Sequence, residues 1–86
     1  MKRWEENNGV YELIIDIYYE ETVVLQFCRD KNDNECYNYT SEMLKVEDDC
    51  EYCDSIDEAK ELFEDMIKNH FEDEINYYEV LLINFE

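Results

Sequence analysis

The sequence predicts an α+β fold in which one amphipathic helix packs on one face of a small antiparallel or mixed sheet. Three observations support this prediction. Residues 10–19 and 22–29 alternate between apolar and polar side chains, as half-buried strands do. Residues 55–73 place apolar side chains at helical spacing behind a strong N-terminal cap. Residues 77–85 form a dense apolar run typical of a central strand. The predicted order is β-β-β-α-β, in a single acidic domain spanning residues 1–86.

The first two strands are predicted to form a hairpin. The odd-numbered residues from Tyr11 to Tyr19 share one face of the first strand, and those from Val23 to Phe27 share one face of the second. Only Glu20-Glu21 separates the runs, so this pair is expected to form the turn, although it lacks the usual Gly or Asn. A polar turn over residues 30–34 then leads to a third strand over 36–40. Residues 41–46 are ambiguous.

The helix has the clearest local signal. Ser55 is a favourable N-cap, and Glu58 stands three residues later, as in a capping box. The apolar stripe runs from Ile56 to Ile67, and acidic side chains occupy the opposite side. We expect the helix to end near Phe71 to Asp73 and the chain to return as the final strand.

The charge is the strongest pointer to function. The chain has 25 Asp and Glu against 7 Lys and Arg, a formal net charge of −18. A small domain needs a net charge of only roughly 2–8 for solubility. Residues 47–74 alone hold 13 acidic and two basic side chains. Such a surface repels nucleic acids and membranes, and it attracts proteins whose basic grooves hold DNA or RNA.

Carboxylates repeated along a helix can occupy positions meant for phosphates, since helical turns recur every ~5.4 Å and phosphates on one DNA strand every ~3.4 Å. The alternative is a solvated face that only maintains solubility. A tyrosine beside these acids, Tyr52, would suit insertion next to an Arg of the partner. The predicted partner-binding residues are Glu47, Asp48, Asp49, Glu51, Tyr52, Asp54, Asp57, Glu58, Glu61, Glu64 and Asp65.

The four cysteines offer a second hypothesis, a small zinc-dependent structural or adaptor module. Cys50 and Cys53 form a C-x-x-C pair, but Cys28 and Cys36 lie further apart than ligand pairs usually do. A redox motif is disfavoured because the surrounding carboxylates raise thiol pKa values. Ordinary reduced thiols are the simplest interpretation.

An enzyme is not expected, because the sequence contains no nucleophile–base pair, metal triad or cofactor loop. His70 has no catalytic partner that the sequence can assign. We therefore expect no catalytic residues, no bound metal and no cofactor. No signal peptide or membrane-spanning run is apparent, which favours a cytoplasmic location with reduced thiols.

Small size, extreme acidity, a short α+β pattern and the lack of a catalytic motif resemble the phage-encoded anti-CRISPR proteins. Phage inhibitors of restriction enzymes and of uracil-DNA glycosylase are similar at this level. The resemblance concerns general character, so it assigns no individual residue. It implies a non-enzymatic inhibitor, acting in the cytoplasm of an infected bacterium, that blocks the nucleic-acid channel of a CRISPR-Cas effector nuclease through a DNA-mimicking face. It implies no direct binding of nucleic acid.

Overall fold

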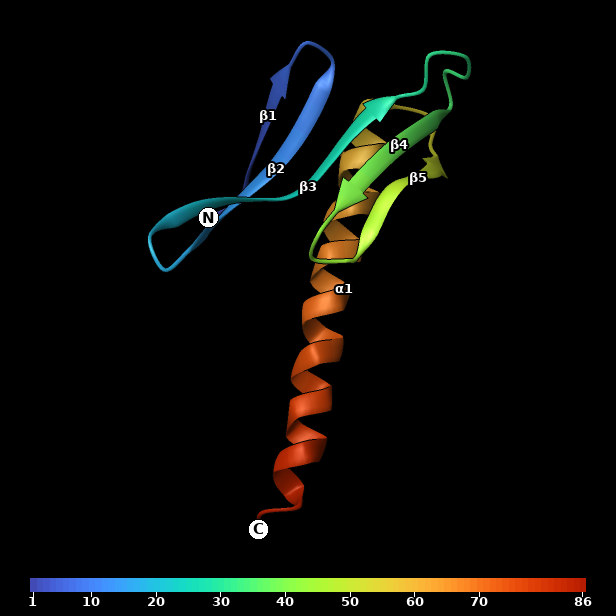
Figure 1. Cartoon of the computed structure of the whole chain (residues 1–86). Helices are drawn as coiled ribbons and strands as arrows, with labels where there is room; N and C mark the ends of the chain where they lie inside the picture. Colours follow the sequence, from blue (N-terminus) through green and yellow to red (C-terminus); the bar gives the residue numbers. More distant parts are fainter.

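A computed structural model describes residues 1–86 as a five-stranded antiparallel sheet followed by one long helix (Figure 1). The strands are neighbours in chain order, and the helix lies against one face of the sheet and continues beyond it. The α+β class is therefore confirmed, but the order is β-β-β-β-β-α, not β-β-β-α-β. The elements are β1 (Arg3–Asn7), β2 (Val10–Ile17), β3 (Glu20–Arg29), β4 (Cys36–Ser41), β5 (Val46–Tyr52) and α1 (Ile56–Ile83).

The sequence analysis did not predict strand β1. It pairs with β2 through a turn at Asn8 and Gly9, whose φ angles are 54° and 81°. A tight two-residue hairpin turn of this type requires a positive φ at both central residues, and Asn-Gly is the dipeptide that adopts these angles most readily. This dipeptide was therefore a signal for an additional hairpin, and it places Trp4 against the core.

The hairpin of β2 and β3 is confirmed, but its turn is at Tyr18 and Tyr19 instead of Glu20-Glu21. Both tyrosines have positive φ and are almost fully exposed. A bulge between Leu13 and Ile14 also changes the predicted faces. It turns Val24 into the core and leaves Val23 47% exposed, because one extra residue in a strand reverses the alternation.

Strand β5 occupies residues between the predicted third strand and the helix, where no strand was predicted. The chain turns tightly after β4, where the Lys45 N–H donates to the Glu42 carbonyl at 3.1 Å, and then pairs with β4. Because the sheet order ends at β5, this strand is an edge. Its sequence, VEDDCEY, has little β-propensity, so the pairing comes from tertiary context.

Aromatic side chains hold the helix on the sheet. The ring of Phe63 lies 4.9 Å from that of Phe27 and 4.8 Å from that of Tyr39, and all three are buried. Ala59 and Ile67 extend the buried stripe of α1 in both directions. The predicted cap is confirmed: the Glu58 N–H donates to Ser55 Oγ at 3.1 Å. Burial of this stripe is the main stabilising contribution of the helix.

The predicted final strand over residues 77–85 is wrong. The helix continues through Ile83 to its cap at Asn84, and much of its second half projects beyond the sheet (Figure 1). The chain has no Pro and only one Gly, so nothing after Phe71 interrupts the helix. Its large apolar side chains are consequently exposed instead of filling the centre of a sheet.

Candidate protein-binding surface

The predicted partner-binding residues lie on two neighbouring elements. Five are on the edge strand β5, Asp54 is in the short connection, and the remaining five are on α1. Nine of the carboxylates carry no structural ion pair and are called here the acidic edge. They are Glu47, Asp48, Asp49, Glu51, Asp54, Asp57, Glu58, Glu61 and Asp65.

Acidic groups from β5 and α1 converge near the start of the helix. Burial raises the pKa of the Cys53 thiol, and the negative charges of Glu58, Glu51 and Asp54 raise it further. These three carboxylates come from the helix, the strand and the connection. The pKa of Tyr39 is likewise raised by burial and by two β5 carboxylates, those of Asp49 and Glu51. Carboxylates of β5, α1 and the connection between them therefore act together on the groups at this end of the molecule.

Local hydrogen bonds hold part of this surface in place. A Glu58 carboxylate oxygen accepts a hydrogen bond from the Asp54 N–H at 3.4 Å. In a capping box this carboxylate would accept from the N–H of the cap residue, Ser55, and here it accepts from the residue before it. The Asp49 carboxylate accepts from the N–H of Cys50 at 2.9 Å. The Asp48 N–H donates to Thr40 Oγ1 at 3.0 Å. The acidic edge is thus attached to a hydrogen-bonded scaffold.

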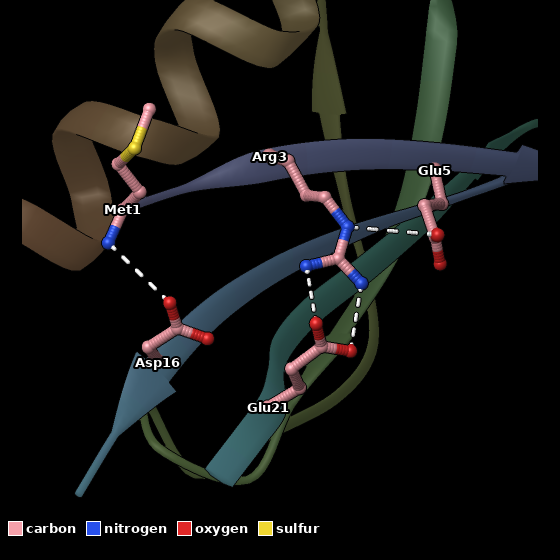
Figure 2. A network of polar contacts seen from close by, with 5 residues as sticks. All are labelled: Met1, Arg3, Glu5, Asp16 and Glu21. Atoms are coloured by element: carbon pink, nitrogen blue, oxygen red, sulfur yellow. Dashed lines mark hydrogen bonds and ion pairs between the residues drawn. The ribbon is translucent and has the colours of Figure 1, made fainter. Parts of the chain in front are cut away.

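The ion pairs of the chain lie away from the acidic edge. Figure 2 shows Arg3 bonded to Glu21 through both terminal nitrogens, at 2.9 and 2.8 Å, and paired with Glu5 at 3.6 Å. The hydrogen bond from Arg3 lowers the pKa of Glu21. The Met1 amino group pairs with Asp16 at the same end of the sheet. No ion pair reaches the acidic edge, so its charge remains uncompensated.

Glu64 differs from the other predicted site residues. Its carboxylate accepts a hydrogen bond from Trp4 Nε1 at 2.6 Å and forms an ion pair with Lys2. Burial raises the pKa of Glu64, but the bonds from Lys2 and Trp4 outweigh it and hold the pKa below its usual value. Lys60 lies over the rings of Trp4 and Tyr11 on the same side. Glu64 therefore joins β1 to α1, and its charge is neutralised locally.

The four cysteines do not form a common site. Cys28 and Cys50 both pair with Asn38 in the sheet, whereas Cys53 belongs to the core beneath the helix. Burial raises the pKa of Cys36 to about 11. No group of three or more His, Cys, Asp or Glu side chains is arranged to hold a metal ion.

Tyr52, the predicted anchor residue, is the last residue of β5, and its side chain is exposed.

No family model, curated protein or solved structure matches the chain. None of the helices is long and apolar enough to cross a membrane.

The sequence analysis missed a second surface of unusual character, on the helix end. Eight large apolar side chains between Ile75 and Phe85 are at least 40% exposed. Their signal was present in the spacing of Phe71, Ile75, Tyr78, Leu82 and Phe85, which alternates between four and three residues. The prediction of a strand over residues 77–85 hid this helical repeat, because a short apolar run fits both the two-residue period of a strand and the 3.6-residue period of a helix.

Proposed function

We propose that the protein is a non-enzymatic inhibitor that uses the acidic edge to occupy the nucleic-acid channel of a basic, nucleic-acid-handling protein. A CRISPR-Cas effector nuclease is the target class that we favour. The observation that carries the proposal is the set of nine carboxylates, on adjoining elements, that no Lys, Arg or His neutralises. A partner with a positive channel would supply the missing counter-charge.

The arrangement on the helix supports mimicry of a phosphate row. Glu58, Glu61 and Asp65 are exposed and spaced by three and four residues, so they form one line along the outer side of α1. Turns of a helix recur at ~5.4 Å, a spacing of the same order as the ~3.4 Å between phosphates of one strand. The β5 carboxylates provide a second group beside this line. A cationic channel could therefore contact two rows of fixed charge.

Protection of the sheet edge accounts for only part of this charge. Acidic residues on an edge strand prevent unwanted pairing with another chain, which explains the carboxylates of β5. The carboxylates of α1 have no such role, because a helix has no unpaired edge. Attachment to a folded scaffold also reduces the ordering cost of binding. These features favour an interaction surface over a coating that only aids solubility.

The first experiment identifies the target by salt-dependent capture. The full chain is immobilised and exposed to bacterial lysate at low salt, and bound proteins are eluted with high salt and identified by mass spectrometry. Nucleic-acid-binding proteins should dominate the eluate, because screening weakens contacts between exposed charges. Recovery of only proteins without nucleic-acid sites would contradict the proposal.

A pair of double variants tests the surface itself. Reversing Glu61 and Asp65 to Lys should leave folding intact, since both side chains are exposed, and should weaken binding to the captured target by about tenfold or more, about 1.4 kcal/mol. The matched control reverses Glu6 and Glu20, which are exposed, unpaired and distant from β5, and changes the net charge equally. DNA or RNA of the target should compete with the protein. Equal effects of both double variants would show that only net charge matters.

A further inference from the structure

The second half of α1 displays an apolar stripe without a partner inside the molecule. The side chains of Ile75, Tyr78, Leu82 and Phe85 are 57%, 57%, 62% and 86% exposed. They follow Phe71 at alternating spacings of four and three residues, which is the repeat of helices that pack against one another. Tyr77 and Leu81 adjoin the stripe on the side that, earlier in the helix, faces the sheet.

The sheet cannot cover this stripe. The buried residues of α1 are Ala59, Phe63 and Ile67, all in its first half, and the helix then leaves the sheet (Figure 1). Apolar patches of this kind on a folded protein mark interaction surfaces. Helix ends without tertiary packing are also only marginally stable in water. The stripe therefore requires a partner of matching character.

We propose that two copies of this chain pair through the stripe as an antiparallel, two-fold symmetric dimer centred near Tyr78. In this pairing Ile75 faces Leu82 of the second copy, and Phe71 faces its Phe85. The six apolar side chains on this side, at roughly 100 Å² each, supply most of the ~800 Å² per partner that a standard interface buries. The same surface serves both copies, as a two-fold interface requires.

Charge favours this orientation. Residues 75–86 contain only two of the 25 acidic side chains, Glu79 and Glu86, so like-charge repulsion in this segment is much weaker than in the acidic part of the helix before it. An antiparallel pair also places the two acidic sheets at opposite ends. A parallel pair would bring them side by side, where like charges repel. The dimer would then present two separated acidic edges.

A hollow at the far end of the stripe fits the same arrangement. It lies between β2 and α1, has a volume of about 470 Å³, and is floored by Leu13, Ile15, Ile67 and Phe71. The antiparallel register brings Phe85 of the second copy to this hollow. Four charged residues complete its lining: Lys2, Glu64, Asp65 and Lys68. Lys2 pairs with Glu64, whereas Lys68 makes no ion pair and can face Glu86 of the second copy. The most exposed apolar residue of the stripe thus has an apolar site to enter.

The test is the mass of the full chain in solution, measured by sedimentation equilibrium at micromolar concentrations. The wild type should be a dimer, and added salt should strengthen it by screening repulsion, opposite to the expected effect on target binding. Leu82→Glu should weaken the dimer by about tenfold or more. Ile83→Glu is the matched control, because Ile83 is 63% exposed, receives the same charge and points about 100° away. Its dimer should be nearly unaffected.

Oxidative cross-linking tests the orientation. Tyr78→Cys should form a covalent dimer, because this position faces itself across the axis. Leu82→Cys and Ile83→Cys should not, with the wild type as the control for the native cysteines. Efficient cross-linking of Leu82→Cys would indicate a parallel pair and overturn the arrangement. A monomeric wild type, or equal weakening by Leu82→Glu and Ile83→Glu, would overturn the dimer. Both results concern residues 78–83, outside the acidic edge. Asp65 lines the hollow, so Glu61→Lys alone, measured for dimer mass and for target binding, separates the two proposals.

Discussion

At the scale of single residues, Glu64 shows how context separates chemically identical side chains. It stands in the same acidic helix as Glu61, yet only Glu64 contacts Trp4 of β1 and Lys2, which precedes that strand. Helical spacing turns it toward the first hairpin, whereas Glu61 points to solvent. One carboxylate therefore holds the fold together, and the other contributes to the uncompensated charge.

The lowered pKa of Glu64 gives a pH-dependent prediction. A carboxyl group whose pKa is lower in the folded state stabilises the protein above its unfolded pKa, near 4.5, and this contribution is lost as the pH falls through the folded pKa. Glu64→Gln should therefore lower the free energy of unfolding by about 1.5–3 kcal/mol at pH 7, as expected for hydrogen bonds to a charged group.

Urea denaturation at several pH values measures this effect. The difference between wild type and Glu64→Gln should shrink as the pH falls below 4.5. Glu61→Gln, which removes no contact, should stay within about 0.5 kcal/mol of the wild type. A constant difference across the pH range would mean that the ionised carboxylate is not what stabilises the fold.

At the scale of elements, α1 divides into two halves with different roles. The first half packs Phe63 between Phe27 and Tyr39, whereas the second half leads to Phe85, which follows the Asn84 cap and has 86% of its surface exposed. Residues 70–83 hold even more apolar side chains than residues 56–69, eight against six, so composition does not explain why only the first half is buried. Only the position of the sheet beneath the helix does.

The same substitution in each half should separate these roles. Phe63→Ala should destabilise the protein by about 3–5 kcal/mol, through lost burial and a residual cavity. Phe85→Ala should change the free energy of unfolding by less than about 0.5 kcal/mol in dilute protein, where chains are separate. Urea denaturation followed by circular dichroism makes the comparison. A large loss for Phe85→Ala in dilute protein would place that residue in the core.

At the scale of the whole molecule, the net charge of −18 opposes the fold. The ion pairs gather mainly around β1, so they relieve repulsion at one end of the sheet and leave the acidic edge unrelieved. Self-repulsion of this kind destabilises a compact state. The carboxylates of the acidic edge lower the stability of the fold and form no ion pair within it, which is consistent with selection for binding a partner.

Salt should therefore stabilise the protein. Raising ionic strength from about 0.01 M to about 0.15 M shortens the Debye length from ~30 Å to ~8 Å and screens the repulsion. Each kcal/mol gained should raise the melting temperature by about 4–8 °C in a domain of this size. Scanning calorimetry of wild type and of the Glu61→Lys, Asp65→Lys double variant makes the test. The double variant should have the higher melting temperature at low salt and a smaller increase in melting temperature with added salt. A melting temperature that falls with salt would contradict the prediction.

The sequence by itself determined the α+β class, three of the five strands, the Ser55 cap and the acidic segment, because alternation, capping and charge are local properties. The candidate surface was also readable as a set of acidic residues. The sequence did not show that Glu64 is structural while the other carboxylates form the acidic edge. This difference depends on contacts of Glu64 with Lys2 and Trp4.

Tertiary structure decided β5, whereas the length of α1 followed from a sequence without helix breakers after Phe71. The acidic residues 46–52 form a strand because β4 offers a free edge, which outweighs their weak β-propensity. Residues 77–83 suit either a strand or a helix by composition, and continuation of an unbroken helix settled the choice. Pairing between distant segments carries a free energy that no local pattern contains, and for that reason the strand order became visible only in the folded chain. The spacing of the stripe was present in the sequence, but its exposure depends on where the sheet ends.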